Sequence, residues 1–113
     1  MNADIKKLWV AALESGDYQQ QVGSLRAGNR FCCLGVLCNL HAQAHPEIAA
    51  KQYYDNLYMH CTSLLPVPVF LWAGLNYASG NEVTIENKKL SLTYHNDSGR
   101  TFKEIAQAIR EQL

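Results

Sequence analysis

This sequence lacks an excess of positive or of negative charge. Ten lysines and arginines balance ten aspartates and glutamates among 113 residues, so the formal net charge is zero. A protein that neutralises nucleic-acid phosphates needs a basic excess, and one that imitates nucleic acid needs an acidic excess. We therefore expect no direct nucleic-acid binding.

Long apolar runs are also lacking. No run reaches the roughly 18 residues that mark a membrane-spanning helix. The polar start, Met1 to Asp4, leads into no apolar signal-peptide core. We therefore expect a cytoplasmic protein without membrane contact. In that compartment its four cysteines stay reduced, namely Cys32, Cys33, Cys38 and Cys61.

The length fits one domain, because two cores would each have too few residues to close. Apolar residues make up 48% of the chain, enough for a core without metal or disulfide staples. The expectation is a single domain over residues 1–113 with no cofactor.

Apolar spacing predicts helices at both ends of the chain. Residues 3–15 follow Asn2, a predicted N-cap, and repeat apolar side chains at helical spacing. This stripe consists of Ile5, Leu8, Trp9, Ala12 and Leu13. Near the other end, Thr101 and Glu104 have the spacing of a capping box and open a terminal helix. Its predicted buried stripe is Phe102, Ile105, Ala106 and Ile109.

The middle of the chain predicts a central buried helix. The run FCCLGVLCNL carries no charge, and we expect a helix from about Cys33 that ends before Pro46. A short helix is possible over Glu47–Gln52. Another, Pro66–Ala73, would end at Gly74.

The remaining segments predict strands. The Gly28-Asn29 turn suggests a hairpin with arms Gln20–Leu25 and Arg30–Cys32. A strand is expected at Val83–Ile85, followed by a polar turn over residues 86–89. Residues 90–95 fit a second strand or a helical turn, and residues 96–99 form a break. The predicted fold class is α+β, with helices packed on a small antiparallel sheet.

A polar set suggests a binding pocket. Arginine offers a planar donor fork for phosphate or carboxylate, and amides can read a base edge. The candidate ligand-binding residues are Gln20, Arg26, Asn96 and Asp97, together with Tyr18 and Trp72. The alternative is that Asn96 and Asp97 only form a turn and that Arg26 pairs with Asp97.

Other side chains suggest different chemistry. Cys33 at a helix start could be a nucleophile with a lowered thiol pKa, with His60 or His95 as its base. Cys38, His41 and His45 share a helical spacing, and with His60-Cys61 could hold zinc. The simpler interpretation of both the Cys33 and the Cys38 patterns is that these cysteines are buried as small apolar residues. We therefore predict no metal site. A protein-binding surface could be built from Tyr53, Tyr54, Tyr58, Tyr77, Met59 and Phe70.

The order of motifs resembles that of a family of small, mostly uncharacterised bacteriophage and prophage proteins. The motifs are WVAALESGDYQQ from Trp9, GSLR from Gly23, FCCLGVLC from Phe31, Leu65-Pro66 with Val69 and WAGL, and NDSG followed by TFKEIA. The sequence departs from the family at Tyr94-His95 and in residues 41–64. The resemblance implies an accessory phage product of the host bacterial cytosol, with counter-defence as its class. It supplies no catalytic residue.

These observations favour binding over catalysis. We expect a protein that blocks or sequesters a host component. It would either dock on a host protein through its tyrosines or hold a small nucleotide-type ligand in the polar pocket. A hydrolase or transferase that uses Cys33 is the alternative, and a homodimer remains open.

Overall fold

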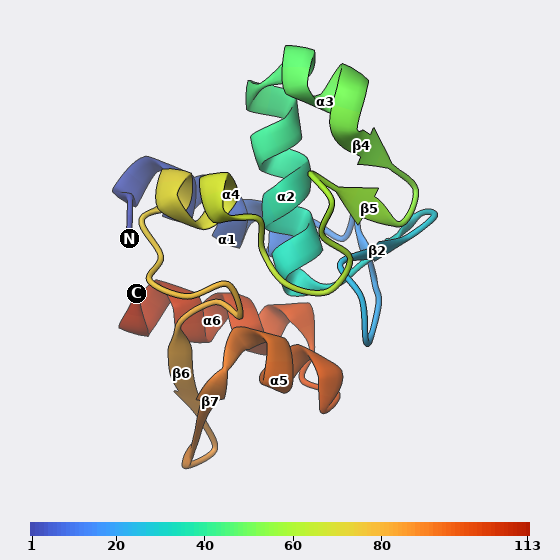
Figure 1. Cartoon of the computed structure of the whole chain (residues 1–113). Helices are drawn as coiled ribbons and strands as arrows, with labels where there is room; N and C mark the ends of the chain where they lie inside the picture. Colours follow the sequence, from blue (N-terminus) through green and yellow to red (C-terminus); the bar gives the residue numbers. More distant parts are fainter.

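The fold is α+β, as the sequence predicts. A computed structural model describes all residues 1–113, with three small sheets at the margins of a group of packed helices (Figure 1). The helices are α1 Ala3–Glu14, α2 Cys33–Ala44, α3 Pro46–Gln52, α4 Val67–Ala73, α5 Leu92–Asp97 and α6 Phe102–Gln112. The strands are β1 Gln19–Gln20, β2 Arg26–Ala27, β3 Arg30–Phe31, β4 Tyr53–Tyr54, β5 Leu57–Tyr58, β6 Glu82–Ile85 and β7 Lys88–Ser91.

Helix α2 is the centre of the core. Its first six residues, 33–38, are all buried, so apolar side chains surround its first half on every side. Helices α1, α4 and α5 all contact it (Figure 1). A Cβ at Gly35 would lie 1.8 Å from the carbonyl oxygen of Leu25, so only glycine lets the backbone before β2 lie against α2.

The two terminal helices pack against each other beside α2. The indole Nε1 of Trp9 donates to the carbonyl oxygen of Cys33 at 2.9 Å and so fixes α1 on α2. The predicted N-cap of α1 and the capping box of α6 are both confirmed, as is the buried stripe of α6. The prediction that Leu8 faces the core is wrong, because α1 turns Val10 inward instead and leaves Leu8 exposed.

The first sheet differs from the predicted hairpin. Strand β3 pairs antiparallel with β2 and parallel with β1, so the sheet is mixed. The arm predicted at Gln20–Leu25 is wrong. A two-residue turn at Gly28-Asn29 joins the residues that flank it directly, which are β2 and β3, and residues 21–25 loop out.

The β6–β7 hairpin leads directly into α5. Glu86 and Asn87 both have positive φ, 49° and 67°, as a two-residue hairpin turn requires. Strand β7 ends at Ser91, whose hydroxyl accepts from the Tyr94 amide at 3.2 Å and caps α5. Both alternatives for residues 90–95 are therefore partly realised. The predicted break at Asn96 is wrong, since this residue lies in the last turn of α5.

Residues 41–64, which gave no clear pattern, form the end of α2, helix α3 and the β4–β5 hairpin. Tyr58 from this hairpin is buried, whereas Tyr54 opposite Leu57 is exposed. No helix in the structure has both the length and the hydropathy that crossing a membrane requires.

Candidate functional site

The side chain of Asn96 joins three parts of the chain. Its Oδ1 accepts from the Gln20 side-chain amide at 2.9 Å and from the Cys33 backbone amide at 3.0 Å. Its Nδ2 donates to the carbonyl oxygen of Gln21 at 2.8 Å. Asn96 is fully buried, so these bonds replace water completely. The amide therefore ties the end of α5 to β1 and to the start of α2.

The neighbours of Asn96 are also engaged within the protein. Gln20 donates to the carbonyl oxygen of Arg100 at 2.7 Å, and the Asp97 carboxylate accepts from the Gly23 amide at 3.0 Å. The structure thus brings Gln20, Asn96 and Asp97 together. It uses their polar groups to join segments, and none of the main surface cavities is lined by them.

The other three candidate residues lie elsewhere. The guanidinium of Arg26 sits 5.0 Å from the Phe31 ring centre and 4.8 Å from that of Tyr53. Its nearest carboxylate is Asp55 at 3.7 Å, so the expected pair with Asp97 is wrong. The Tyr18 hydroxyl accepts from Asn39 at 2.7 Å, and its ring packs edge-on against Phe31.

Trp72 belongs to a separate aromatic cluster on α4. Its ring meets the rings of His41 and His45 edge-on, with centres 5.0 and 5.9 Å apart. The two imidazoles are stacked at 4.1 Å. The structure therefore does not gather the six candidate residues around one cavity: Gln20, Asn96 and Asp97 lie together, whereas Arg26, Tyr18 and Trp72 lie apart from them.

The buried cysteines lack the surroundings of a reactive thiol. Burial raises the pKa of Cys33 well above its usual value, and its thiol points at the carbonyl oxygen of Leu92, 3.6 Å away. Burial likewise raises the pKa of Cys32 to about 11, and its sulfur accepts from the Gly35 amide as the N-cap of α2. A thiolate nucleophile needs the opposite shift, so this geometry gives no support to catalysis by Cys33.

His41 is held in its neutral form beside His45. Nδ1 of His41 lies 2.6 Å from the Tyr58 hydroxyl, and Nδ1 of His45 lies 2.8 Å from the carbonyl oxygen of His41. Burial, and to a lesser extent the charge of His45, lowers the pKa of His41 to about 4. No three histidine, cysteine or carboxylate side chains are placed to hold a metal ion, so the zinc ligand set considered from the sequence is not assembled.

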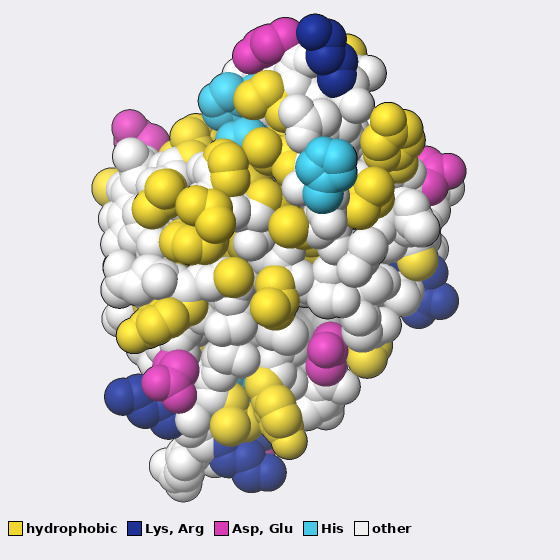
Figure 2. All heavy atoms as spheres, in the orientation of Figure 1, with side chains coloured by type: hydrophobic (Ala, Val, Ile, Leu, Met, Phe, Trp, Pro, Cys, Tyr) yellow, Lys and Arg dark blue, Asp and Glu magenta, His cyan; other side chains and the backbone are white.

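An apolar surface covers the outer side of α4 and part of the segment that leads into it. We call it the α4 face and define it by Leu64, Val67 and Leu71, which are 45%, 58% and 65% exposed. Half-buried Phe70 and Trp72 adjoin it. Figure 2 shows apolar side chains gathered over α4, with histidines among them and charged side chains towards the margins.

Sequence reasoning missed the α4 face because it weighted tyrosines. Of those, Tyr58 is in the core and Tyr53 is half-buried and donates to Asn39 at 3.0 Å, so the tyrosines form no single surface. The available signal was the absence of charge. Residues 56–81 contain no aspartate, glutamate, lysine or arginine.

Comparison with known families agrees with the extent of this fold. The model of a family described as a domain of unknown function, DUF8296, matches residues 1–113. The chain belongs to this family. No curated protein and no solved structure matches the sequence. The DUF8296 match covers the terminal helices as well as the core, so the Asn96 bonds and the α4 face both lie inside the family's extent.

Replacement of Asn96 tests its role in this DUF8296 protein. Asn96→Ala leaves the buried Cys33 amide and the partly buried Gln21 carbonyl without their partners, at about 1–3 kcal/mol each. We expect the free energy of unfolding, measured in urea by tryptophan fluorescence, to fall by about 3 kcal/mol. Asp97→Asn keeps an acceptor for Gly23 and is the matched control, with a small expected change. A loss below about 1 kcal/mol for Asn96→Ala contradicts the assignment.

The His41 environment predicts a pH dependence of stability. An unfolded chain binds this proton near pH 6.5, whereas the folded protein binds it only near pH 4. The unfolded state therefore holds more protons between these values, and stability falls as the pH drops through this window. We expect His41 to contribute on the order of 2 kcal/mol to this fall. In urea titrations His41→Gln flattens the profile, and His60→Gln at an exposed position does not. Parallel profiles for His41→Gln and the unchanged protein disprove this origin.

Thiol labelling separates buried from accessible cysteine. In the folded protein at neutral pH, iodoacetamide is expected to modify half-buried Cys61 at least about tenfold faster than Cys32, Cys33 or Cys38. Peptide mass spectrometry over time gives the four rates, and the same reaction in urea, where all four react, is the control. Fast labelling of Cys33 in the folded state restores the nucleophile hypothesis.

Proposed function

We propose that this protein is a non-catalytic binding protein that docks on a protein of a bacterial host through the α4 face. The observation that supports this proposal is the exposure of Leu64, Val67 and Leu71 within a 26-residue segment without charge, residues 56–81. Contiguous exposed apolar surface of this kind marks protein interaction sites on soluble domains.

The chemistry of the α4 face suits an apolar groove on a partner protein. Val67 and Leu71 are four residues apart, so both project from the same side of the helix. The neighbouring Trp72 is held against the imidazoles of His41 and His45 at the end of α2 and needs little ordering on binding. Rigid aromatic side chains beside exposed aliphatic ones are typical of binding centres, where little conformational entropy is lost.

The resemblance to phage and prophage proteins supports a host component as the partner and counter-defence as the setting. A nucleotide-type ligand has less support, because the side chains of Gln20, Asn96 and Asp97 are already hydrogen-bonded to other groups of the protein. Hydrolysis or transfer by Cys33 has less support because its thiol is buried. The docking proposal uses groups that the fold leaves free.

Lysine substitution on the α4 face tests the proposal. Val67→Lys with Leu71→Lys places two charges on the contact surface and should remove binding without touching the core. Val22→Lys, at an apolar residue that is 54% exposed outside the face, is the matched control. Tagged forms of all three proteins are incubated with a bacterial lysate. The expected result is a bacterial protein retained by the unchanged chain and by the control, and lost with the double variant.

The captured protein is then purified and titrated calorimetrically. We expect the double variant to weaken its affinity at least tenfold, about 1.4 kcal/mol. Equal capture by the double variant contradicts the proposal. Sedimentation of the protein alone gives a second test. A stable dimer that the double variant dissolves would show that a second copy covers the α4 face, and would overturn docking on a host protein.

A further inference from the structure

Strand β6 has a free outer edge. The turn at residues 86–87 makes Ile85 and Lys88 a hydrogen-bonded pair, and the same pairing recurs two residues on at Val83 and Leu90. The backbone groups of Glu82 and Thr84 therefore point away from β7. In Figure 1 β6 is the outer strand of this hairpin, and the end of α6 lies next to it. An edge of this kind can pair with another chain.

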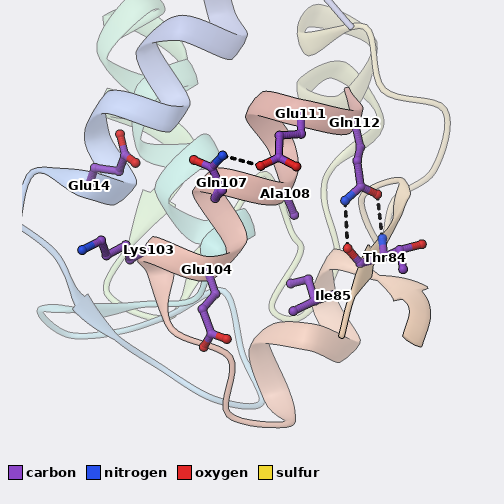
Figure 3. Close-up of a pocket in the computed structure, with 9 residues that line it drawn as sticks. All are labelled: Glu14, Thr84, Ile85, Lys103, Glu104, Gln107, Ala108, Glu111 and Gln112. Carbon is purple, nitrogen blue, oxygen red and sulfur yellow. Dashed lines mark hydrogen bonds between the residues drawn. The ribbon is translucent and has the colours of Figure 1, made fainter. Parts of the chain in front are cut away.

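A side chain occupies part of this edge in place of a strand. The Thr84 amide donates to Oε1 of Gln112 at 2.7 Å, and Nε2 of Gln112 donates to the carbonyl oxygen of Thr84 at 2.8 Å. Figure 3 shows both bonds. A side-chain amide offers one donor and one acceptor like a peptide group, so Gln112 copies the pairing of one residue of a missing strand. Thr84 thus has the geometry needed for strand addition.

A cavity lies beside the capped residue. It has a volume of about 420 Å³ and runs between β6 and the outer side of α6. Ile85 and Ala108 form its apolar part, and Figure 3 shows both next to the Gln112–Thr84 pair. In an added strand, alternate side chains point to opposite faces, so one side chain beside Thr84 can enter this space.

The charge near the edge favours a basic segment. Glu82 on β6 and Glu111 on α6 are exposed, and neither forms an ion pair in the structure. The other hairpin carboxylate, Glu86, already pairs with Arg100 at 3.1 Å. A lysine on an added strand would supply the cation that Glu82 and Glu111 lack. The cavity lining also contains Lys103, but its three carboxylates, Glu14, Glu104 and Glu111, outnumber this cation and disfavour an acidic segment.

We propose that the outer edge of β6 accepts an extended, lysine-bearing segment of another protein as an added strand, and that Gln112 leaves Thr84 when it binds. This inference does not depend on the α4 face. Backbone pairing at Glu82 and Thr84 supplies affinity. The cavity accepts an apolar side chain, and the carboxylates of Glu82 and Glu111 favour a basic one.

The probe is a short capped peptide of alternating lysine and valine, titrated into the isotope-labelled full chain and followed by NMR. We expect the Glu82 and Thr84 amides to shift most. The same peptide with alternate amides N-methylated cannot pair with the edge and should not bind. A peptide with glutamate in place of lysine should bind at least several-fold more weakly.

Variants of the chain test the role of the cap. Gln112→Ala removes the competing amide, so peptide affinity should rise about fivefold, as expected for the loss of one or two hydrogen bonds from the free state. Gln43→Ala is the matched control, because this exposed glutamine lies on α2 and does not line the cavity beside β6. Glu82→Gln with Glu111→Gln should lower the affinity.

Three results would overturn the proposal. One is the absence of any shift at Thr84 with millimolar peptide. Another is equal binding of the N-methylated peptide, which would show that the backbone is not read. The third is an affinity that Gln112→Ala leaves unchanged. All of them can occur while the α4 face still binds its partner, so this proposal and the docking proposal fail separately.

Discussion

The structure depends on how the buried start of α2 satisfies its backbone. The first amides of a helix have no partner within it, and here water cannot reach them because residues 33–38 are buried. Two side chains fill the need. The Cys32 sulfur accepts from the Gly35 amide, and Asn96 accepts from the Cys33 amide across 63 positions of sequence. The second bond requires α5 to end beside α2. This in turn fixes β7, which precedes α5, and the terminal helix α6, which follows it.

The same constraint explains why the polar pattern was ambiguous. Glutamine, asparagine and aspartate near two turns suit a ligand that presents donors and acceptors, but buried backbone presents those groups too. The oxygen and the nitrogen of the Asn96 side-chain amide both bond to backbone groups, and one oxygen of Asp97 accepts from the Gly23 amide. Sequence alone cannot distinguish binding a ligand from binding the protein's own backbone, because the difference depends on which distant segment packs against these side chains. The backbone groups that Asn96 and Asp97 bind lie 63 to 75 positions away in the sequence.

Elements with local signals were predictable. The Asn2 cap, the Thr101 capping box and the glycine after α4 act within a few residues, and each predicted helix start or end was correct to within a residue or two. Elements defined by a distant partner were not. Leu8 faces solvent because α6 and α2 together select which side of α1 is covered, and the parallel pairing of β1 with β3 has no local signal. The α4 face was likewise not predictable, because its exposure depends on no other segment of the chain packing against it.

Balanced net charge conceals an uneven distribution. The ten basic and ten acidic side chains sum to zero net charge, and none of them lies in residues 56–81. The uncharged surface therefore arises because charged residues are concentrated elsewhere in the chain, not because they are few. The edge of β6 is the opposite case, with Glu82 and Glu111 left without cations. Proteins usually protect a strand edge permanently, with a covering element, a proline or a bulge. Here one exposed glutamine protects Thr84, and its rotation costs only two hydrogen bonds that water can replace. A side-chain cap of this kind opposes strand pairing between two copies of the chain. It leaves the Thr84 backbone available to a segment that adds apolar and ionic contacts to its hydrogen bonds.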